Sequence, residues 1–174
     1  MGDVVMLQPE RRPAAAIWLG FAVVAVILSV PARADWQYTK WGMSSEDLYA
    51  LEQGKILKTS PSEETGQSNP YIGRAKLKTS YKAGEIAYTA YFLFNNDKLA
   101  AVSLNPEEPR QSQRVKSQLE STHGVPISTV QLGHGITITK WRDLTKGDMV
   151  WFLSVGENYS IRYCPIISDT AGGF

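Results

Sequence analysis

The stretch Ala87–Leu104, AYTAYFLFNNDKLAAVSL, decides the fold because two apolar runs flank a short polar turn. The turn residues are Asn95-Asn96-Asp97, and Asn and Asp tolerate the left-handed backbone angles of a tight reversal. Before the turn, one strand face would carry Ile86, Tyr88, Ala90, Phe92 and Phe94, and the other Ala87, Thr89, Tyr91 and Leu93. Because both faces are fairly apolar, the sequence predicts a β-hairpin whose first strand is central in a sheet and covered on at least one side.

The first 34 residues have the pattern of a secretory signal. Arg11 and Arg12 precede Ala14–Val30, a run of 17 residues without a charge, and Ala32-Arg33-Ala34 follows. Small residues at the first and third positions of that triplet suit a signal peptidase, so we expect cleavage after Ala34. The alternative is an uncleaved anchor, although 17 residues is short for a bilayer span. We therefore expect a protein exported to the periplasm or the exterior, with membrane contact only if the segment is retained.

The remaining chain, residues 35–174, is expected to form one exported α+β domain. Removal of the first 34 residues takes away three basic and two acidic side chains and leaves 15 of each. A neutral balance gives no electrostatic reason to expect nucleic acid or an anionic membrane as a partner. Cys164 is the single cysteine, so no disulfide can form within the chain. It is interpreted as a small buried hydrophobe, with pairing to another chain as the alternative.

Start and stop signals predict two short helices. Ser44 followed by Glu46 and Asp47 favours a helix start, with Met43, Leu48 and Leu51 as its buried stripe and Gly54 as its end. Arg110–Thr122 carries Val115 and Leu119 four apart, and Gly124 follows it. Lys55–Pro70 has no apolar periodicity and is interpreted as an exposed loop. Trp36–Trp41 alternates large apolar and polar residues and is interpreted as a short first strand.

Two stretches sixty positions apart resemble each other. Tyr91-Phe92-Leu93 and Trp151-Phe152-Leu153 each precede a polar turn and a second strand, and each follows a helix candidate. The pattern favours two internal units, residues 36–104 and 105–166, with a true duplication left open. The expected fold is an antiparallel sheet of about six to eight strands with two short helices on one face.

A family resemblance rests on two motifs. Trp41-Gly42-Met43-Ser44-x-x-Asp47 opens a helix, and Phe92-x-Phe94-x-x-x-Lys98-Leu99 follows. Over Trp41–Leu104 the chain resembles small exported bacterial α+β domains, among them the outer-membrane-assembly lipoprotein family and the β-lactamase-inhibitor-protein-like fold. The resemblance implies binding to other proteins in the envelope or outside the cell. The chain lacks the lipidated cysteine of the first group, and no functional residue carries over.

No matched set of nucleophile, acid and base is visible in the sequence. The two histidines, His123 and His134, are each next to a glycine, and neither has a second metal ligand at helical or strand spacing. Asp143 and Asp148 flank a loop but supply few oxygen ligands for Ca²⁺. We therefore expect no catalytic residue, metal or cofactor, and the row Arg74, Lys76 and Lys78 is interpreted as a solvated face, with a binding stripe as the alternative.

Five aromatic residues are the candidates for contact with a partner: Trp36, Tyr38, Trp41, Trp141 and Trp151. Exposed tryptophan and tyrosine are common anchors of interfaces, whereas buried ones build the core of a small sheet. The sequence favours a non-catalytic protein-binding module of the envelope or periplasm, with a small exported hydrolase acting on envelope material as the alternative. It leaves the partner and the oligomeric state open.

Overall fold

The computed structural model describes residues 36–52 and 54–166 of the chain. The predicted signal segment with its cleavage site after Ala34, and the last eight residues, lie outside this range. The described part forms one eight-stranded antiparallel sheet with three α-helices, which confirms the predicted α+β class. Within the described residues no helix has the length and apolar character needed to cross a membrane.

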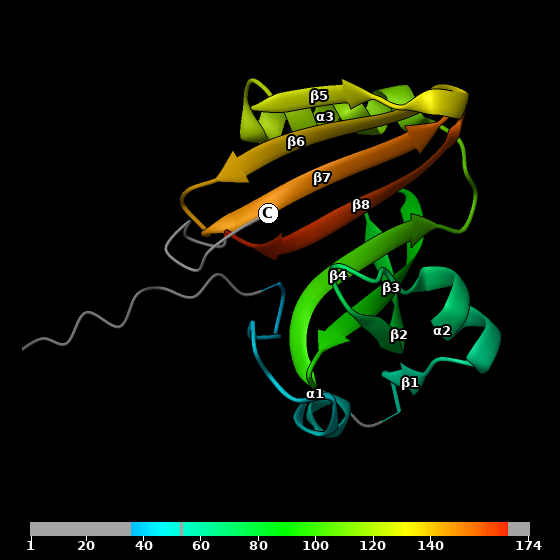
Figure 1. Cartoon of the computed structure of the whole chain (residues 1–174), viewed down its shortest axis with the longest axis vertical. Coiled ribbons are helices and arrows are strands. Elements are labelled where there is room, and N and C mark those ends of the chain that lie inside the picture. Colours follow the sequence, from blue (N-terminus) through cyan, green and yellow to red (C-terminus); the bar gives the residue numbers. More distant parts are fainter. Residues whose placement is uncertain (1–35, 53, 167–174) are drawn as a thin grey trace, which may run out of the picture.

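Each half of the chain contributes helical segments and four strands (Figure 1). The first half contains α1 (Ser45–Leu51), β1 (Leu57–Lys58), α2 (Pro61–Gln67), β2 (Arg74–Ala83), β3 (Ile86–Asn95) and β4 (Lys98–Pro106). The second half contains α3 (Ser112–His123), β5 (Ser128–Gln131), the 3₁₀ turn η1 (Gly133–Gly135), β6 (Ile136–Asp143), β7 (Asp148–Val155) and β8 (Asn158–Pro165).

The sheet consists of two meanders joined by their last strands. The strand order is β1-β2-β3-β4-β8-β7-β6-β5, so β4 and β8 pair in the middle. Only three residue pairs make this junction, Val102–Tyr163, Ser103–Arg162 and Leu104–Ile161. From either edge inward, the order runs from the first strand of a half to its last, which places an approximate twofold relation at the junction. Descent of the two halves from a duplication stays a prediction.

The hairpin of β3 and β4 has the predicted reversal. Asn96 and Asp97 both have positive φ, 48° and 57°, which is the backbone of a two-residue hairpin turn. β3 lies between β2 and β4, and Phe92 and Leu93 are both fully buried although they point to opposite faces. The strand is therefore central and covered on both sides.

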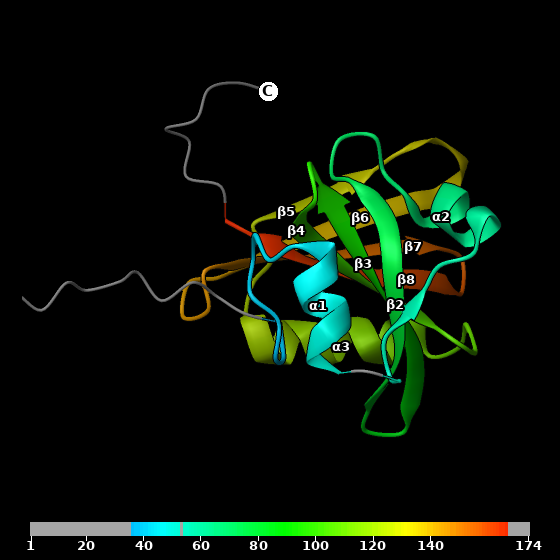
Figure 2. The ribbon, with the colours of Figure 1, turned by 90° about the horizontal axis from the view of Figure 1, so that it is seen from below.

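The two faces of the sheet are covered differently (Figure 2). The main core contains Leu48 of α1 and Val115 and Leu119 of α3, packed with aromatic side chains such as Trp141 and Phe152. Both predicted helices therefore share one face. A smaller cluster on the opposite face, Ala75, Tyr91, Leu93 and Ala101, lies on the side of α2. We call this opposite side the outer face of the sheet.

Three local predictions are wrong. Trp36–Trp41 forms turns instead of a strand: Gln37 has a φ of 57°, and the Thr39 amide and hydroxyl both donate to the Trp36 carbonyl. Leu51 is 52% exposed and does not extend the buried stripe of α1. Lys55–Pro70 contains β1 and α2 instead of a plain loop.

Helix α2 has a start signal but no buried side chain. The Ser60 hydroxyl accepts from the Glu63 amide and the Glu63 carboxylate accepts from the Ser60 amide, which is a capping box, and Pro61 occupies the first turn. No residue of α2 is buried, so the segment lacks the apolar period that marks a packed helix. Its contacts with the sheet are polar and include the ion pairs of Glu63 and Glu64 with β2.

Candidate functional site

A row of six side chains crosses the outer face of the sheet from one half to the other. The strand registers pair Lys78 with Tyr91, Tyr91 with Ser103, Ser103 with Arg162, Arg162 with Trp151, and Trp151 with Lys140. Directly paired residues of antiparallel strands point to the same face. The row therefore reads lysine, aromatic, serine, arginine, aromatic, lysine, with the twofold relation between Ser103 and Arg162. We call these six residues the cross-strand row.

In the first half, α2 covers the row. The Lys78 ammonium donates to Glu63 of α2, and the Tyr91 hydroxyl donates to the same carboxylate oxygen, Oε1, at 3.4 Å. Arg74 Nη2 lies 2.6 Å from Glu64, and Asn105 donates to Gln67 at 2.7 Å. A surface helix with no buried side chain is thus held mainly by polar contacts to the sheet. Beneath it Tyr91 is 8% exposed and Leu93 is fully buried.

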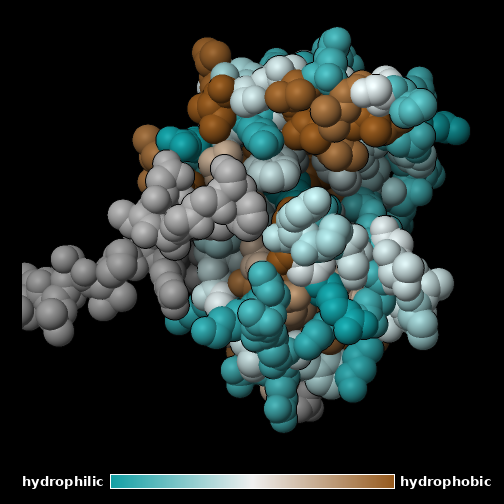
Figure 3. All heavy atoms as spheres, viewed as in Figure 1, coloured by the Kyte–Doolittle hydropathy of each residue, from teal (hydrophilic) through white to brown (hydrophobic). Residues whose placement is uncertain are grey.

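In the second half, no described element covers the row. Lys140 Nζ lies 4.2 Å from the centroid of the Trp151 ring, which is close cation–π geometry. Leu153, which stands in β7 where Leu93 stands in β3, is 37% exposed. Val155, two positions further along β7, is 39% exposed, and Val130, which lies on β5 across Ile138 of β6, is 43% exposed. We call the outer face of β5–β8 the open face; in Figure 3 hydrophobic side chains gather over its β5–β7 part, at the upper right.

The open face carries cations without carboxylates. The strand registers place Lys140, Arg142 and Arg162 on it, and the outward positions of β6, β7 and β8 include no acidic residue. None of these three cations makes an ion pair with another described residue. In the first half, by contrast, Lys78, Arg74 and Lys76 pair with Glu63, Glu64 and Asp97.

Two donors of the open face are buried and unused. Trp151 Nε1 and Arg162 Nε are inaccessible to solvent, and neither has a hydrogen-bond partner in the described part of the chain. Burial lowers the pKa of the Arg162 guanidinium. A buried donor without an acceptor costs about 1–3 kcal/mol. The open face is therefore short of hydrogen-bond acceptors at the centre of the cross-strand row.

The structure separates the five candidate aromatic residues into two groups. Trp36, Trp41 and Trp141 are 6%, 5% and 0% exposed and belong to the main core. Their placement favours the core role, and a partner could reach them only by opening the fold. Tyr38 is 39% exposed in the turn segment between Trp36 and Trp41 and is not a member of the cross-strand row. Trp151 alone of the five belongs to that row, so we keep it as the partner-binding candidate.

Cys164 lies on the outer face two positions after Arg162, packed against the smaller cluster. Burial raises the pKa of its thiol to about 11, and the nearby Arg162 acts in the opposite direction. A thiol with so high a pKa carries little thiolate at neutral pH, so this cysteine is a poor nucleophile. The placement supports the interpretation of a small buried hydrophobe.

His123 and the two aspartates lie on the main-core side. His123 Nδ1 is 3.6 Å from Asp143 Oδ2, and burial lowers the pKa of the imidazole while Asp143 opposes that shift. Asp148 is 2% exposed and accepts from Trp41 Nε1 at 2.8 Å. No group of three or more potential metal ligands occurs among the described residues. His134 has a φ of 61° in η1, as expected of a turn residue.

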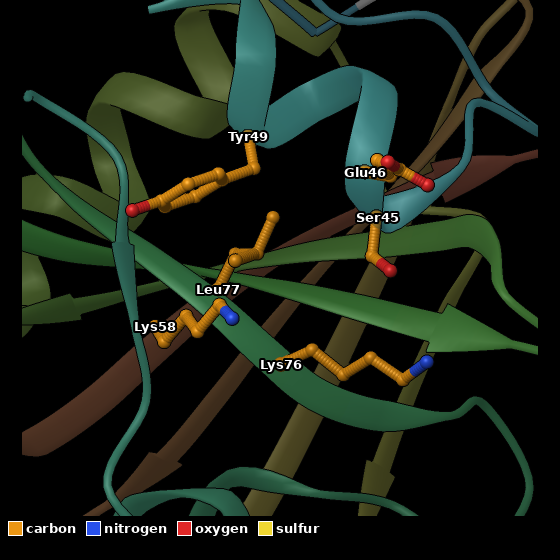
Figure 4. A pocket seen from close by; sticks show the side chains of 6 residues that line it. All are labelled: Ser45, Glu46, Tyr49, Lys58, Lys76 and Leu77. Atoms are coloured by element: carbon orange, nitrogen blue, oxygen red, sulfur yellow. The ribbon is translucent and has the colours of Figure 1, made fainter. Parts of the chain in front are cut away.

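A shallow hollow of about 500 Å³ lies between α1 and strands β1 and β2 (Figure 4). Tyr49, Glu46 and Ser45 line it from the helix, and Lys58, Lys76 and Leu77 from the strands. The Lys76 ammonium is held by Asp97 at 2.9 Å, and Lys58 lies 5.7 Å from the centre of the Tyr49 ring.

The basic residues Arg74, Lys76 and Lys78 each form an ion pair, with Glu64, Asp97 and Glu63 respectively. The row is therefore a set of ion pairs and neither a freely solvated face nor a free binding stripe.

The Glu63 carboxylate predicts how α2 responds to acid. Hydrogen bonds from Lys78 and from Ser60 lower its pKa to about 2, below the ordinary value of 4.5. A carboxylate with a lowered pKa stabilises the fold above its unfolded pKa, and the effect is lost as pH falls through the folded value. We expect the Glu63 side chain to titrate near pH 2 by NMR, and the protection factors of the α2 amides, relative to the intrinsic exchange rate at each pH, to fall between about pH 4.5 and 2. Titration near 4.5 with α2 still protected would contradict this account of its docking.

Comparisons with known proteins returned no relatives. No protein-family model matches the sequence, and no match appears among curated proteins or among solved structures. The function of this chain must therefore be inferred from its own residues and geometry.

Sequence reasoning found Trp151 but missed Lys140 and Arg162. The two cations are 22 positions apart in sequence and flank Trp151 on either side because β6 and β8 both pair with β7. A usable signal was present: the matched runs around Tyr91 and Trp151 imply matched neighbours, and each aromatic residue has a lysine on the preceding strand. The assignment of that lysine requires the strand register, which sequence alone did not supply.

Proposed function

We propose that this chain is an exported, non-catalytic protein-binding module of the cell envelope or periplasm, which holds its partner on the open face. The observation that carries the proposal is the contrast between Leu93 and Leu153. The first is fully buried under a helix, and the second, at the matching position of the other half, is 37% exposed among aliphatic neighbours. A contiguous apolar patch with a polar rim is typical of an interaction surface.

Export is supported by the sequence of the first 34 residues, and binding by the composition of the open face. Trp151 and Arg162 are the residue types that most often dominate interface energies. Removal of the exposed apolar side chains from water would favour association by roughly 25 cal/mol for each Å² covered. The described residues bring together no nucleophile with a matched base, so nothing in the site favours hydrolysis.

Site-specific crosslinking in living cells tests the proposal. A photoreactive leucine analogue is placed at Leu153, and the matched control carries it at Leu144, which is 79% exposed in the turn between β6 and β7. We expect one dominant protein adduct from position 153 and none of that species from position 144. Mass spectrometry of the purified protein checks whether its first residue is Asp35. Equal adduct patterns from the two positions, or no adduct from position 153, would refute the open face as the binding surface.

A further inference from the structure

The covered half of the outer face is an internal reference for the open half. In both halves a lysine and an aromatic residue stand side by side on neighbouring strands, Lys78 with Tyr91 and Lys140 with Trp151. In the covered half both groups donate to one carboxylate, that of Glu63 on α2. In the open half, Trp151 Nε1 is buried without an acceptor in the described chain, and Lys140 Nζ lies over the Trp151 ring instead of against a carboxylate. Among the described residues, the open half therefore lacks the carboxylate that the lysine and the aromatic residue bind in the covered half.

Arg162 adds to this demand for negative charge. It lies next to Trp151 on β8, at the position that Ser103 takes on β4, and its Nε is buried without an acceptor in the described chain. Lys140 and Arg162 are on strands two spacings apart, which is about 10 Å. Two turns of an α-helix span about 11 Å, so one helix lying across the strands reaches both cations.

The apolar side chains next to the cross-strand row indicate a second property of the binding partner. Leu153, Val155 and Val130 are exposed along β7 and β5, on one side of Trp151 and Lys140. An occupant that satisfies the cations and covers these side chains must carry carboxylates beside an apolar stripe. An acidic amphipathic helix has both of these features.

We infer that the open face binds an acidic amphipathic helix of a partner protein, in the place that α2 takes on the other half of the sheet. The inference rests on the proposed function and names the chemistry of its partner. One carboxylate of this helix pairs with the Lys140 ammonium, which lies over the Trp151 ring, and a second one pairs with the Arg162 guanidinium. An added strand at the free edge of β5 would not satisfy these donors, because Trp151 is two strands away from that edge.

The test combines crosslinking at Leu153 with charge reversal. The double variant Lys140→Glu, Arg162→Glu is compared with Lys40→Glu, Lys98→Glu, which makes the same charge change at two exposed lysines outside the open face. Loss of charge-assisted hydrogen bonds should lower the adduct yield by about tenfold or more in the first variant and leave the second unchanged. Because Arg162 is half-buried, the single variant Lys140→Glu and a thermal melt of each protein separate lost binding from lost folding.

The identity of the crosslinked segment gives a second readout. Mass spectrometry should locate it in a helix with glutamate or aspartate beside apolar residues. A synthetic peptide of that segment should bind the purified protein, and Glu→Gln exchange in it should weaken binding by about tenfold. An adduct that persists in Lys140→Glu, or that maps to a segment without carboxylates or to an extended strand, overturns this inference but keeps the proposed function. No adduct from the unaltered protein overturns both.

Discussion

Replacement of Trp141 by alanine will lower the free energy of unfolding by about 3–5 kcal/mol. The indole is fully buried in the main core, and its Nε1 donates to the Gly124 carbonyl at 3.0 Å, next to the end of α3. The substitution leaves a large cavity in the core and removes the hydrogen-bond donor of the Gly124 carbonyl at the end of α3. Urea denaturation followed by circular dichroism measures the change.

Trp151→Ala is the matched control for this prediction. The Trp151 ring lies on the open face and is only partly buried, so we expect a loss of about 1 kcal/mol, near the centre of the range for ordinary substitutions. Both variants remove an indole side chain, so the difference between their losses of stability reports the difference between a core ring and a surface ring. Equal losses of stability would contradict the assignment of Trp151 to an accessible surface.

Much of the fold follows from short-range patterns that physical chemistry makes reliable. The turn at Asn96-Asp97, the cap at Ser44 and the Val115–Leu119 seam each depend on residues within a few positions of one another. Helix α2 escaped prediction because its stabilising contacts are long-range ion pairs, such as Glu63 with Lys78, and not a buried apolar stripe. Leu57–Lys58 is too short for a period to be seen.

The candidate site was only partly predictable for a related reason. Hydrophobicity marks a tryptophan as an anchor or a core residue without deciding between them, and only the packing shows that Trp141 is core while Trp151 is on the outer face. The cross-strand row joins residues between Lys78 and Arg162 through five strand pairings. A shift of one residue in any pairing would send its members to opposite faces, so the row exists only in the folded sheet.

Gly73→Ala is expected to destabilise the protein by about 2–4 kcal/mol, from a backbone conformation that costs an alanine about 1–3 kcal/mol and from a steric clash. Gly73 has a φ of 150°, and a Cβ built on it would lie 2.5 Å from the Phe94 carbonyl oxygen. The contact is with backbone of the central strand β3, which cannot move aside without breaking its pairing. Thermal and urea unfolding measure the effect.

Gly66→Ala, also a glycine-to-alanine substitution, is expected to stabilise the protein instead of destabilising it. Gly66 lies in α2, its φ is outside the left-handed region, and a Cβ there would meet no atom within 4 Å beyond the helix's own backbone and the adjacent residues. Alanine should therefore stabilise the helix by about 0.5–1 kcal/mol. Because α2 is fixed to the sheet through Glu63 and Glu64, the gain should appear as slower amide exchange within α2. If both alanines were neutral, the tight approach of residue 73 to β3 and the helical state of α2 would each be refuted.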